Sequence, residues 1–248
     1  LSDTWQPVEI KLENKDLSNV IGGFAWIGRR CDNDEPITFY LDDIAFDLEP
    51  SAEPLPALTR RPFWIYKDDD STCNHYSPSG WMGDAETPGR ISLAQNWPDN
   101  PHSSPTAIQV VYSEKVAGWA GVYWLDPDQN WGDHPGGYDL TGADRLTFWA
   151  RSDPATPNAQ VEFVIGGIGY YTPNGDPICS IPNKTYYDSV CPKITQTETL
   201  GTTWAQYVID LTNQVPLPDL SGVMGAFGWV ATDEVTFYLD DIAYEFDQ

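Results

Sequence analysis

The sequence is short of positive charge, with 13 Lys and Arg against 37 Asp and Glu among 248 residues, and a formal net charge of −24 at pH 7. Such a charge repels the phosphates of nucleic acids and the head groups of anionic lipids, so nucleic acid is excluded as a partner. No apolar run approaches the ~18 residues that a membrane-spanning helix needs, and no membrane insertion is predicted. No signal peptide is visible either, so we interpret Leu1 as the mature or truncated start of a secreted chain.

Catalytic patterns are also missing. The three histidines, His75, His102 and His134, are scattered in loop-like contexts. There is no G-x-S-x-G, no H-E-x-x-H and no Cys/His arrangement that would indicate a nucleophile or a zinc site. A glycosidase needs two carboxylates facing one cleft, and the E-x-D-x-x-E string of jelly-roll glucanases does not occur here. We therefore predict that the chain is not an enzyme.

Cysteine is scarce but even in number. The four cysteines fit no C-x-x-C metal spacing, which favours disulfides in an oxidising, extracellular compartment. Cys179 and Cys191 bracket a polar stretch and are predicted to pair locally, whereas a disulfide between Cys31 and Cys73 is a weaker expectation.

Residue patterns that are typical of β-strands are abundant in the sequence. Short runs of Val, Ile, Thr and aromatic residues are separated by turns rich in its 21 Pro and 20 Gly, and no helix is evident. Many short strands with turns between them predict an all-β antiparallel sandwich or barrel. The expected strands are 8–12, 20–28, 37–46, 63–67, 107–113, 120–125, 145–152, 160–168, 204–211, 223–230 and 235–246.

An internal repeat divides the chain. The octapeptide TFYLDDIA occurs at 38–45 and again at 236–243, TWQPVEIKL (4–12) aligns with TWAQYVIDL (203–211), and LSNVIGGFAW (17–26) aligns with LSGVMGAFGW (220–229). Residues 1–50 are therefore interpreted as the last three strands of a domain whose complete copy is 62–248. The Pro- and Ala-rich stretch 51–61 is predicted to be a linker.

Three strands cannot close a two-sheet sandwich, and alone they would leave unpaired edges and apolar faces. The sequence leaves three explanations open. The natural protein is longer, or the trio packs on the complete domain, or it completes a sandwich in a neighbouring molecule by strand addition.

The pattern W-x-x-(Y/V)-x-I-x-L, a Gly-rich strand with an aromatic, and a last strand reading F-Y-L-D-D-I resemble the closing half of jelly-roll carbohydrate-binding modules of secreted bacterial polysaccharide-degrading proteins. The resemblance implies a two-sheet jelly-roll sandwich and a glycan partner. The matching residues are Trp204, Tyr207, Ile209, Leu211, Phe227, Trp229, Phe237, Tyr238, Leu239, Asp240, Asp241 and Ile242.

The resemblance also implies a structural Ca²⁺ at the aspartate that follows F-Y-L. Carried over, this indicates Asp240 as a ligand, with Asp68 or Asp69 of the first strand. Neighbouring side chains of a strand point to opposite faces, so one carboxylate of each Asp-Asp pair should point inward and need a partner. A hydrogen-bonded structural aspartate is the alternative for Asp240.

Aromatic residues provide the candidate glycan site. Trp and Tyr interleaved with Gly, Asp, Asn and Gln combine flat apolar faces for sugar rings with polar groups for hydroxyls. Trp131, in the loop DQNWGDHPGG, is the residue most expected to be exposed, although alternation along AGVYWL would bury half of its aromatics. The candidates are Trp131, Trp124, Trp119, Tyr138, Trp81 and Trp97.

These observations predict a non-catalytic, secreted glycan-binding jelly-roll module with structural calcium. The alternative is a structural subunit of an extracellular filament or surface layer, in which residues 1–50 mediate self-association by strand complementation between jelly-roll copies.

Overall fold

The structure is a computed structural model, and it describes residues 4–10, 12, 22–26, 38–46, 62–103, 105–171, 177–178 and 188–246. The chain separates into two compact units, Leu1–Arg60 with Gln248, and Arg61–Asp247. Each unit is described by itself. None of the described residues belongs to a helix long and apolar enough to cross a membrane.

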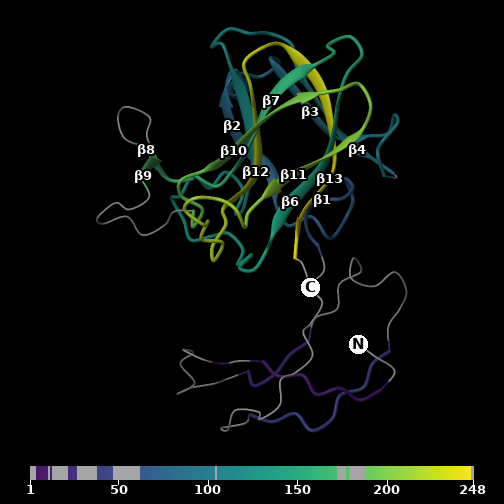
Figure 1. Cartoon of the computed structure of the whole chain (residues 1–248), viewed down its shortest axis with the longest axis vertical. Coiled ribbons are helices and arrows are strands. Elements are labelled where there is room, and N and C mark those ends of the chain that lie inside the picture. Colours follow the sequence, from purple (N-terminus) through teal and green to yellow (C-terminus); the bar gives the residue numbers. More distant parts are fainter. Residues whose placement is uncertain are drawn as a thin grey trace. The chain divides into compact units, whose positions relative to one another are not determined.

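The second unit is a sandwich of two antiparallel sheets (Figure 1). The first sheet has the order β11-β6-β13-β4-β3, with β1 also paired to β13, and the second has the order β10-β7-β12-β5-β2. The strands are β1 (Phe63–Tyr66), β2 (Ser77–Gly83), β3 (Ile91–Trp97), β4 (Ala107–Tyr112), β5 (Ala120–Leu125), β6 (Arg145–Ser152), β7 (Ala159–Ile165), β10 (Ile194–Leu200), β11 (Ala205–Asp210), β12 (Gly225–Ala231) and β13 (Val235–Glu245). A short 3-10 turn, η2 (Asp84–Glu86), follows β2, and β8 (Tyr170–Tyr171) pairs with β9 (Pro177–Ile178). The predicted all-β jelly-roll sandwich is confirmed.

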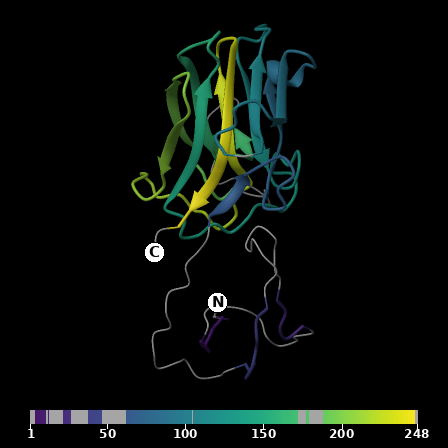
Figure 2. The same cartoon turned by 90° about the vertical axis from the view of Figure 1, so that its right-hand side faces the viewer.

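The last strand, β13, organises the first sheet. Its 11 residues pair with β6 on one side and with β4 and β1 on the other, and Figure 2 shows it in the middle of the sheet. Phe237 and Leu239 point into the sandwich, where they are completely buried. Alternation of apolar and other residues thus places one face of β13 in the core.

The core lies between the sheets and is dominated by aromatic rings. Phe148, Phe163 and Phe227 form a mutually contacting group, with ring centroids 4.4 to 5.8 Å apart. Aromatic side chains bury large apolar areas and gain further from tilted contacts, so this cluster contributes much of the stability.

Three strands of the sandwich were absent from the sequence-based expectation. β2 reads SPSGWMG, β3 reads ISLAQNW and β10 reads ITQTETL. All three are edge strands, so few of their side chains need to be apolar. Ser, Pro, Gly and Gln in such positions resemble a turn when the sequence is considered alone.

The strands predicted at 8–12, 20–28 and 37–46 are not formed in the described part of the first unit. Residues 8–10, 12, 22–26 and 38–46 belong to no hydrogen-bonded strand, and nearly all of them are exposed. A strand is held by the strands next to it, and in the complete domain the corresponding neighbours come from other parts of the sequence.

The cysteines differ from the prediction in one respect. Cys73 is a buried, free thiol, so the expected pairing with Cys31 is wrong; Cys73 lies in the turn after β1, where its N–H donates to Ser71 Oγ. Cys31 lies outside the described residues. Cys191 is disulfide-bonded. Its predicted partner Cys179 also lies outside the described residues, so that pairing stays a prediction.

Candidate functional site

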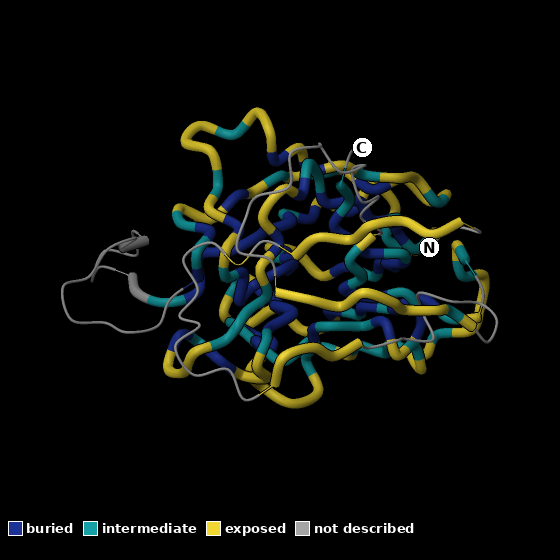
Figure 3. The backbone as a smooth tube through the Cα atoms, turned by 90° about the horizontal axis from the view of Figure 1, so that it is seen from below, coloured by how far each residue is buried: buried dark blue, intermediate teal, exposed yellow. Residues whose placement is uncertain are grey.

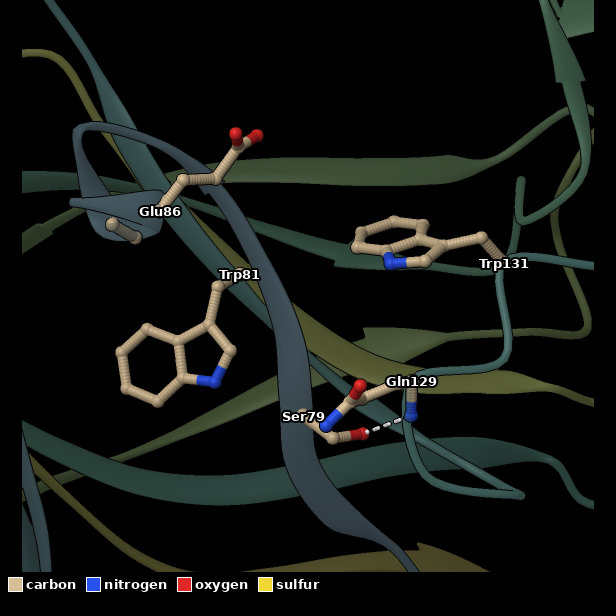
Figure 4. A pocket seen from close by; sticks show the side chains of 6 residues that line it. Ser79, Trp81, Glu86, Gln129 and Trp131 are labelled. Carbon is tan, nitrogen blue, oxygen red and sulfur yellow. Dashed lines mark hydrogen bonds between the residues drawn. The ribbon is translucent and has the colours of Figure 1, made fainter. Parts of the chain in front are cut away.

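An open hollow of about 400 Å³ lies along β2, the edge strand of the second sheet. It is lined by Ser79, Trp81, Ala85, Glu86, Gln129 and Trp131. Figure 4 shows the two indoles on opposite sides of the β2 ribbon, with Ser79 and Gln129 at one end and Glu86 at the other. The lining combines flat apolar faces with a hydroxyl, an amide and a carboxylate, which is the chemistry that sugar rings and hydroxyl groups require.

Asn130 builds the loop that carries Trp131. Its side chain is almost fully buried, and its Oδ1 accepts the N–H groups of Gly132, Asp133 and His134 at 3.1, 3.0 and 3.2 Å. Its Nδ2 donates to the carbonyl of His134 at 3.0 Å. A buried amide that satisfies several backbone groups holds a loop that has no regular structure of its own.

The same loop is attached to β2. The N–H of Gln129 donates to Ser79 Oγ at 2.9 Å, and Ser77 Oγ donates to Asp128. Gln129 has a left-handed backbone conformation, with φ 59°. This combination brings the Gln129 side chain to the hollow.

Trp131 is held from beneath by the outer face of the second sheet. Its ring meets the edge of Tyr123 at 6.3 Å and 84°, and it packs on a small buried cluster that includes Leu125, Val164 and Met224. Tyr123 is itself fixed, because its hydroxyl donates to the carbonyl of Gly166 at 3.0 Å. The indole is therefore partly exposed but rigidly supported, which lowers the entropy cost of binding a ligand.

Asp84 fixes the other end of the hollow. This completely buried carboxylate accepts hydrogen bonds from Tyr112 Oη at 2.6 Å, from Arg90 Nη1 at 2.7 Å, and from the N–H groups of Val116 and Ala117 at 2.8 Å. Burial would raise its pKa, but these donors together hold the pKa of Asp84 well below its usual range. An ionised, fully bonded Asp84 anchors η2, the turn that carries Glu86.

Two of the predicted glycan residues, Trp81 and Trp131, line the hollow. Trp119 lies nearby: 38% of it is exposed, and it packs against Gly83, where φ is 62° and a Cβ would lie 2.6 Å from the Trp119 carbonyl oxygen. It does not line the hollow.

The other three predicted residues lie elsewhere. Trp124 is completely buried against Phe227, so its assignment to glycan binding is wrong: alternation along β5 turns it into the core. Tyr138 packs among Phe63, His75 and Tyr76. Trp97 packs on Tyr238 of the first sheet, with a ring distance of 6.1 Å.

The outer face of the first sheet carries a second aromatic group, which is covered by the chain's own Arg151 and His102 side chains. The guanidinium of Arg151 lies 3.8 Å from the ring centre of Tyr238 and 5.2 Å from that of Trp204. The imidazole of His102 stacks on Trp149 at 3.6 Å. These rings are already covered, so they offer less open surface than the hollow along β2.

The aspartate pair of β13 occupies a β-bulge. The register of β13 against β6 shifts between Asp240 and Ala243, and Asp241 has a left-handed φ of 48°. The bulge breaks the alternation on which the sequence-based expectation rested, so both carboxylates contact the same loop. Asp241 Oδ2 lies 2.8 Å from His102 Nδ1, and its Oδ1 accepts Ser103 Oγ at 2.9 Å.

Asp240 is completely buried and hydrogen-bonded. Its Oδ2 accepts the N–H groups of His102 and Ser103 at 2.9 and 3.0 Å, and its Oδ1 accepts the N–H of Asp241 at 2.9 Å. Burial raises the pKa of Asp240 to about 7, even though these donors favour the ionised form. Of the two roles that the sequence left open for Asp240, these contacts are those of the hydrogen-bonded structural aspartate.

The two other predicted calcium ligands do not complete a site. Asp68 is buried and its Oδ1 accepts the N–H of Thr106 at 3.1 Å, whereas Asp69 is exposed. Within the part of the chain that the structure describes, no three Asp, Glu, His or Cys side chains gather closely enough to hold a metal ion. Calcium therefore stays a prediction of the sequence.

Sequence reasoning missed Ser79, Glu86 and Gln129. Gln129 stands two residues before Trp131, so a search for polar residues near an exposed Trp could have found it. Ser79 and Glu86 come from β2 and the turn after it, and β2 was not predicted as a strand.

No protein-family model matches the chain, and a search of curated proteins finds no match. Among solved structures, the chain is similar to a family 30 carbohydrate-binding module, with 15% identity, a TM-score of 0.46 and coverage of 76% of this chain and 89% of that one. The family 30 module of the cellulosomal cellulase Cel9D-Cel44B of Clostridium thermocellum gives 14% identity, a TM-score of 0.45, and coverage of 76% and 99%.

A family 11 carbohydrate-binding module of the cellulosomal cellulase Lic26A-Cel5E of Clostridium thermocellum gives 13% identity, a TM-score of 0.42, and coverage of 73% and 92%. These proteins belong to the group that the closing-strand motif resembles. Identities and TM-scores this low carry no argument about the ligand, which depends on the side chains of a site rather than on its scaffold.

Proposed function

We propose that residues 62–248 form a non-catalytic, secreted module that binds glycan in the hollow along β2. The observation that carries this proposal is that Trp81, Trp131, Ser79, Glu86 and Gln129 all line one open hollow, with the two indoles on opposite sides of β2. The rigid support of Trp131 by Tyr123 and by the Asn130 loop favours stacking on a sugar ring, because little mobility remains to be lost. The disulfide bond of Cys191 supports an oxidising, extracellular location.

The test is retention on a panel of insoluble polysaccharides, compared between the intact chain and Trp131→Ala. A partly exposed aromatic anchor at a binding site is commonly worth more than 1 kcal/mol, so retention should fall about tenfold on the polysaccharide that the intact chain binds. Trp119→Ala is the matched control, because Trp119 is also exposed but lies outside the hollow.

Retention that survives Trp131→Ala but is lost in Trp119→Ala would move the site to the Trp119 edge. An intact chain that binds no polysaccharide of the panel would refute glycan binding. Melting temperatures of both variants should stay within a few degrees of the intact chain, which separates lost binding from lost folding.

A second candidate function is assembly through residues 1–50, as in an extracellular filament or surface layer. The observation that favours it is the exposure of Trp5, Ile10 and Trp26 in the first unit, at 69%, 69% and 62%. Apolar side chains exposed together are typical of interaction surfaces. Light scattering of the intact chain tests this function: concentration-dependent oligomers that Trp26→Asp dissolves would support it, and a monomer at all concentrations would contradict it.

A further inference from the structure

The described segments of the first unit expose the residues that its sequence repeat buries. Figure 3 colours nearly all of 4–10, 22–26 and 38–46 as exposed. Trp26, Leu41 and Ile44 are 62%, 49% and 56% exposed. Their counterparts in the second unit are all 0% exposed: Trp229, Leu239 and Ile242. The same side chains are therefore buried in one copy and exposed in the described part of the other.

The second unit identifies that cover. We call β11, β12 and β13 the closing strands of the second unit, and together they form its closing set. The counterparts of these strands in the first unit, 4–12, 22–26 and 38–46, form a second closing set. The strands β1 to β10 are the opening strands, or the opening set. In the first sheet β6 lies between β11 and β13, and β4 borders β13 on its other side; in the second sheet β12 lies between β5 and β7. No closing strand is hydrogen-bonded to another closing strand. A closing set alone therefore lacks every one of its strand partners.

The closing set of the first unit already has the packing of the second. The rings of Trp26 and Phe39 meet edge to face, 5.0 Å apart at 85°. Their counterparts Trp229 and Phe237 meet at 5.2 Å and 83°. The contact between Trp26 and Phe39 thus has the geometry of the contact between β12 and β13 in the second unit.

The bulge at the aspartate pair is also preformed. Asp43 has a φ of 50°, and its N–H donates to Asp42 Oδ1 at 2.9 Å, as Asp241 donates to Asp240 at 2.9 Å. In the second unit this bulge receives two backbone N–H groups from the loop before β4. Both Asp42 and Asp43 are exposed, so an equivalent loop can reach them.

We propose that the described segments 4–10, 22–26 and 38–46 form a docking surface for a polypeptide segment that carries a jelly-roll opening set without closing strands of its own. One strand of that segment would insert between 4–12 and 38–46, as β6 does between β11 and β13, and two others would flank 22–26, as β5 and β7 flank β12. Binding would combine main-chain hydrogen bonds with burial of the exposed apolar side chains, as in strand addition. This inference rests on the second candidate function and names its partner.

An intact second copy of residues 62–248 does not fit this role. Each copy holds one opening set, and its own closing strands β11 to β13 already occupy the places beside β4, β5, β6 and β7. Residues 1–248 contain two closing sets and one opening set, so exchange between copies of residues 1–248 leaves one closing set uncovered in each. The partner must bring an opening set from outside residues 62–248.

The test extends the full chain at its N-terminus by a second copy of residues 61–199, joined directly to Leu1, because Leu1 aligns with Leu200 in the repeat. Amide hydrogen exchange is then measured for 38–46 and for 236–244. The inference predicts at least hundredfold slower exchange of 38–46 in the extended chain than in the original chain, approaching the rate of 236–244. Unchanged exchange of 38–46 would overturn it.

Two variants of the extended chain test whether the protection of 38–46 depends on burial of its apolar side chains. Leu41→Asp should return 38–46 to fast exchange, whereas Glu9→Ala, a change at an exposed polar residue, should leave the protection in place. If 38–46 stays unprotected while the original chain forms oligomers that Trp26→Asp dissolves, assembly through residues 1–50 stands and the opening-set partner is refuted. If 38–46 becomes protected and the original chain is a monomer, the partner stands and self-association is refuted.

Discussion

The octapeptide TFYLDDIA at 38–45 and its second copy at 236–243 have the same local backbone and opposite burial. Both place the second aspartate in the left-handed region, with φ of 50° and 48°, and both make the same N–H to carboxylate bond within the pair. Leu41 is nevertheless 49% exposed, whereas Leu239 is completely buried. The bulge is therefore encoded locally, but the strand and its burial depend on the opening strands.

The two units differ in the kind of partner that each could bind. The second unit has a closed core and an open hollow along β2, so the aromatic residues of that hollow are available to a small ligand. The first unit has the rings and the bulge of a jelly roll without its cover, so its apolar side chains are available to a protein partner.

Truncation of the matched leucines Leu239 and Leu41 should give the largest difference between the two copies. Leu239→Ala removes a completely buried side chain and should lower the free energy of unfolding of the second unit by about 2–5 kcal/mol. Leu41→Ala changes an exposed side chain and should alter stability by about 0.5 kcal/mol or less. Urea denaturation of the full chain measures both, and equal losses would show that Leu41 is buried as well.

The pH dependence should come from the second unit. Burial raises the pKa of both Asp188 and Asp240 to about 7, so each carboxyl keeps a proton in the folded state that it loses in the unfolded state. The unfolded state then binds fewer protons between pH 4 and 7, and stability falls as pH rises through that window, by on the order of 2–4 kcal/mol, before it levels off.

Urea midpoints measured from pH 4 to 8 test this dependence. Acids whose pKa is lowered, such as Asp210 and Asp219, change the stability only below this pH window. Within the window they are ionised in both the folded and the unfolded state. Stability that rises steadily from pH 4 to 7 would contradict the burial of Asp188 and Asp240 without a cation.

A smaller effect is expected for the matched aspartates. Asp240→Ala leaves the N–H groups of His102 and Ser103 without their acceptor and should cost about 1–3 kcal/mol. Among the described residues, no N–H group of a neighbouring loop donates to Asp42. Asp42→Ala should therefore change the stability very little. Thermal melting of the two variants provides the comparison, and a loss of similar size in Asp42→Ala would mean that the first bulge also holds a loop.

The smallest effect is expected for calcium. Because Asp240 is satisfied by three N–H donors, melting temperatures in a chelator and in millimolar Ca²⁺ should agree within about a degree. A higher melting temperature in Ca²⁺ that Asp240→Asn abolishes would instead establish the calcium site that the resemblance implies.

Much of the fold could be predicted from the sequence, because the buried strands are apolar. β5, β6, β12 and β13 have long runs of Val, Phe, Trp and Tyr, and the repeat located the closing strands. β2 and β10 could not be found, because strands at or near a sheet edge need little apolar side chain.

The site was predicted only in part. Trp131 was expected to be exposed from its Gly- and Asp-rich loop, and Trp81 from a similar context, and both line the hollow. Trp124 was misplaced because alternation leaves open which of two neighbouring residues faces the core. Asp240 and Asp241 contact one loop because of a bulge that alternation cannot reveal.

The most direct test of the account is amide hydrogen exchange of the full chain, comparing the peptide that covers 38–46 with the one that covers 236–244. The two peptides have nearly the same sequence, so their intrinsic exchange rates are nearly equal and any difference reports structure. The account predicts strong protection of 236–244 and almost none of 38–46. Comparable protection of the two would show that the first closing strand already has its partners, and would contradict the central claim.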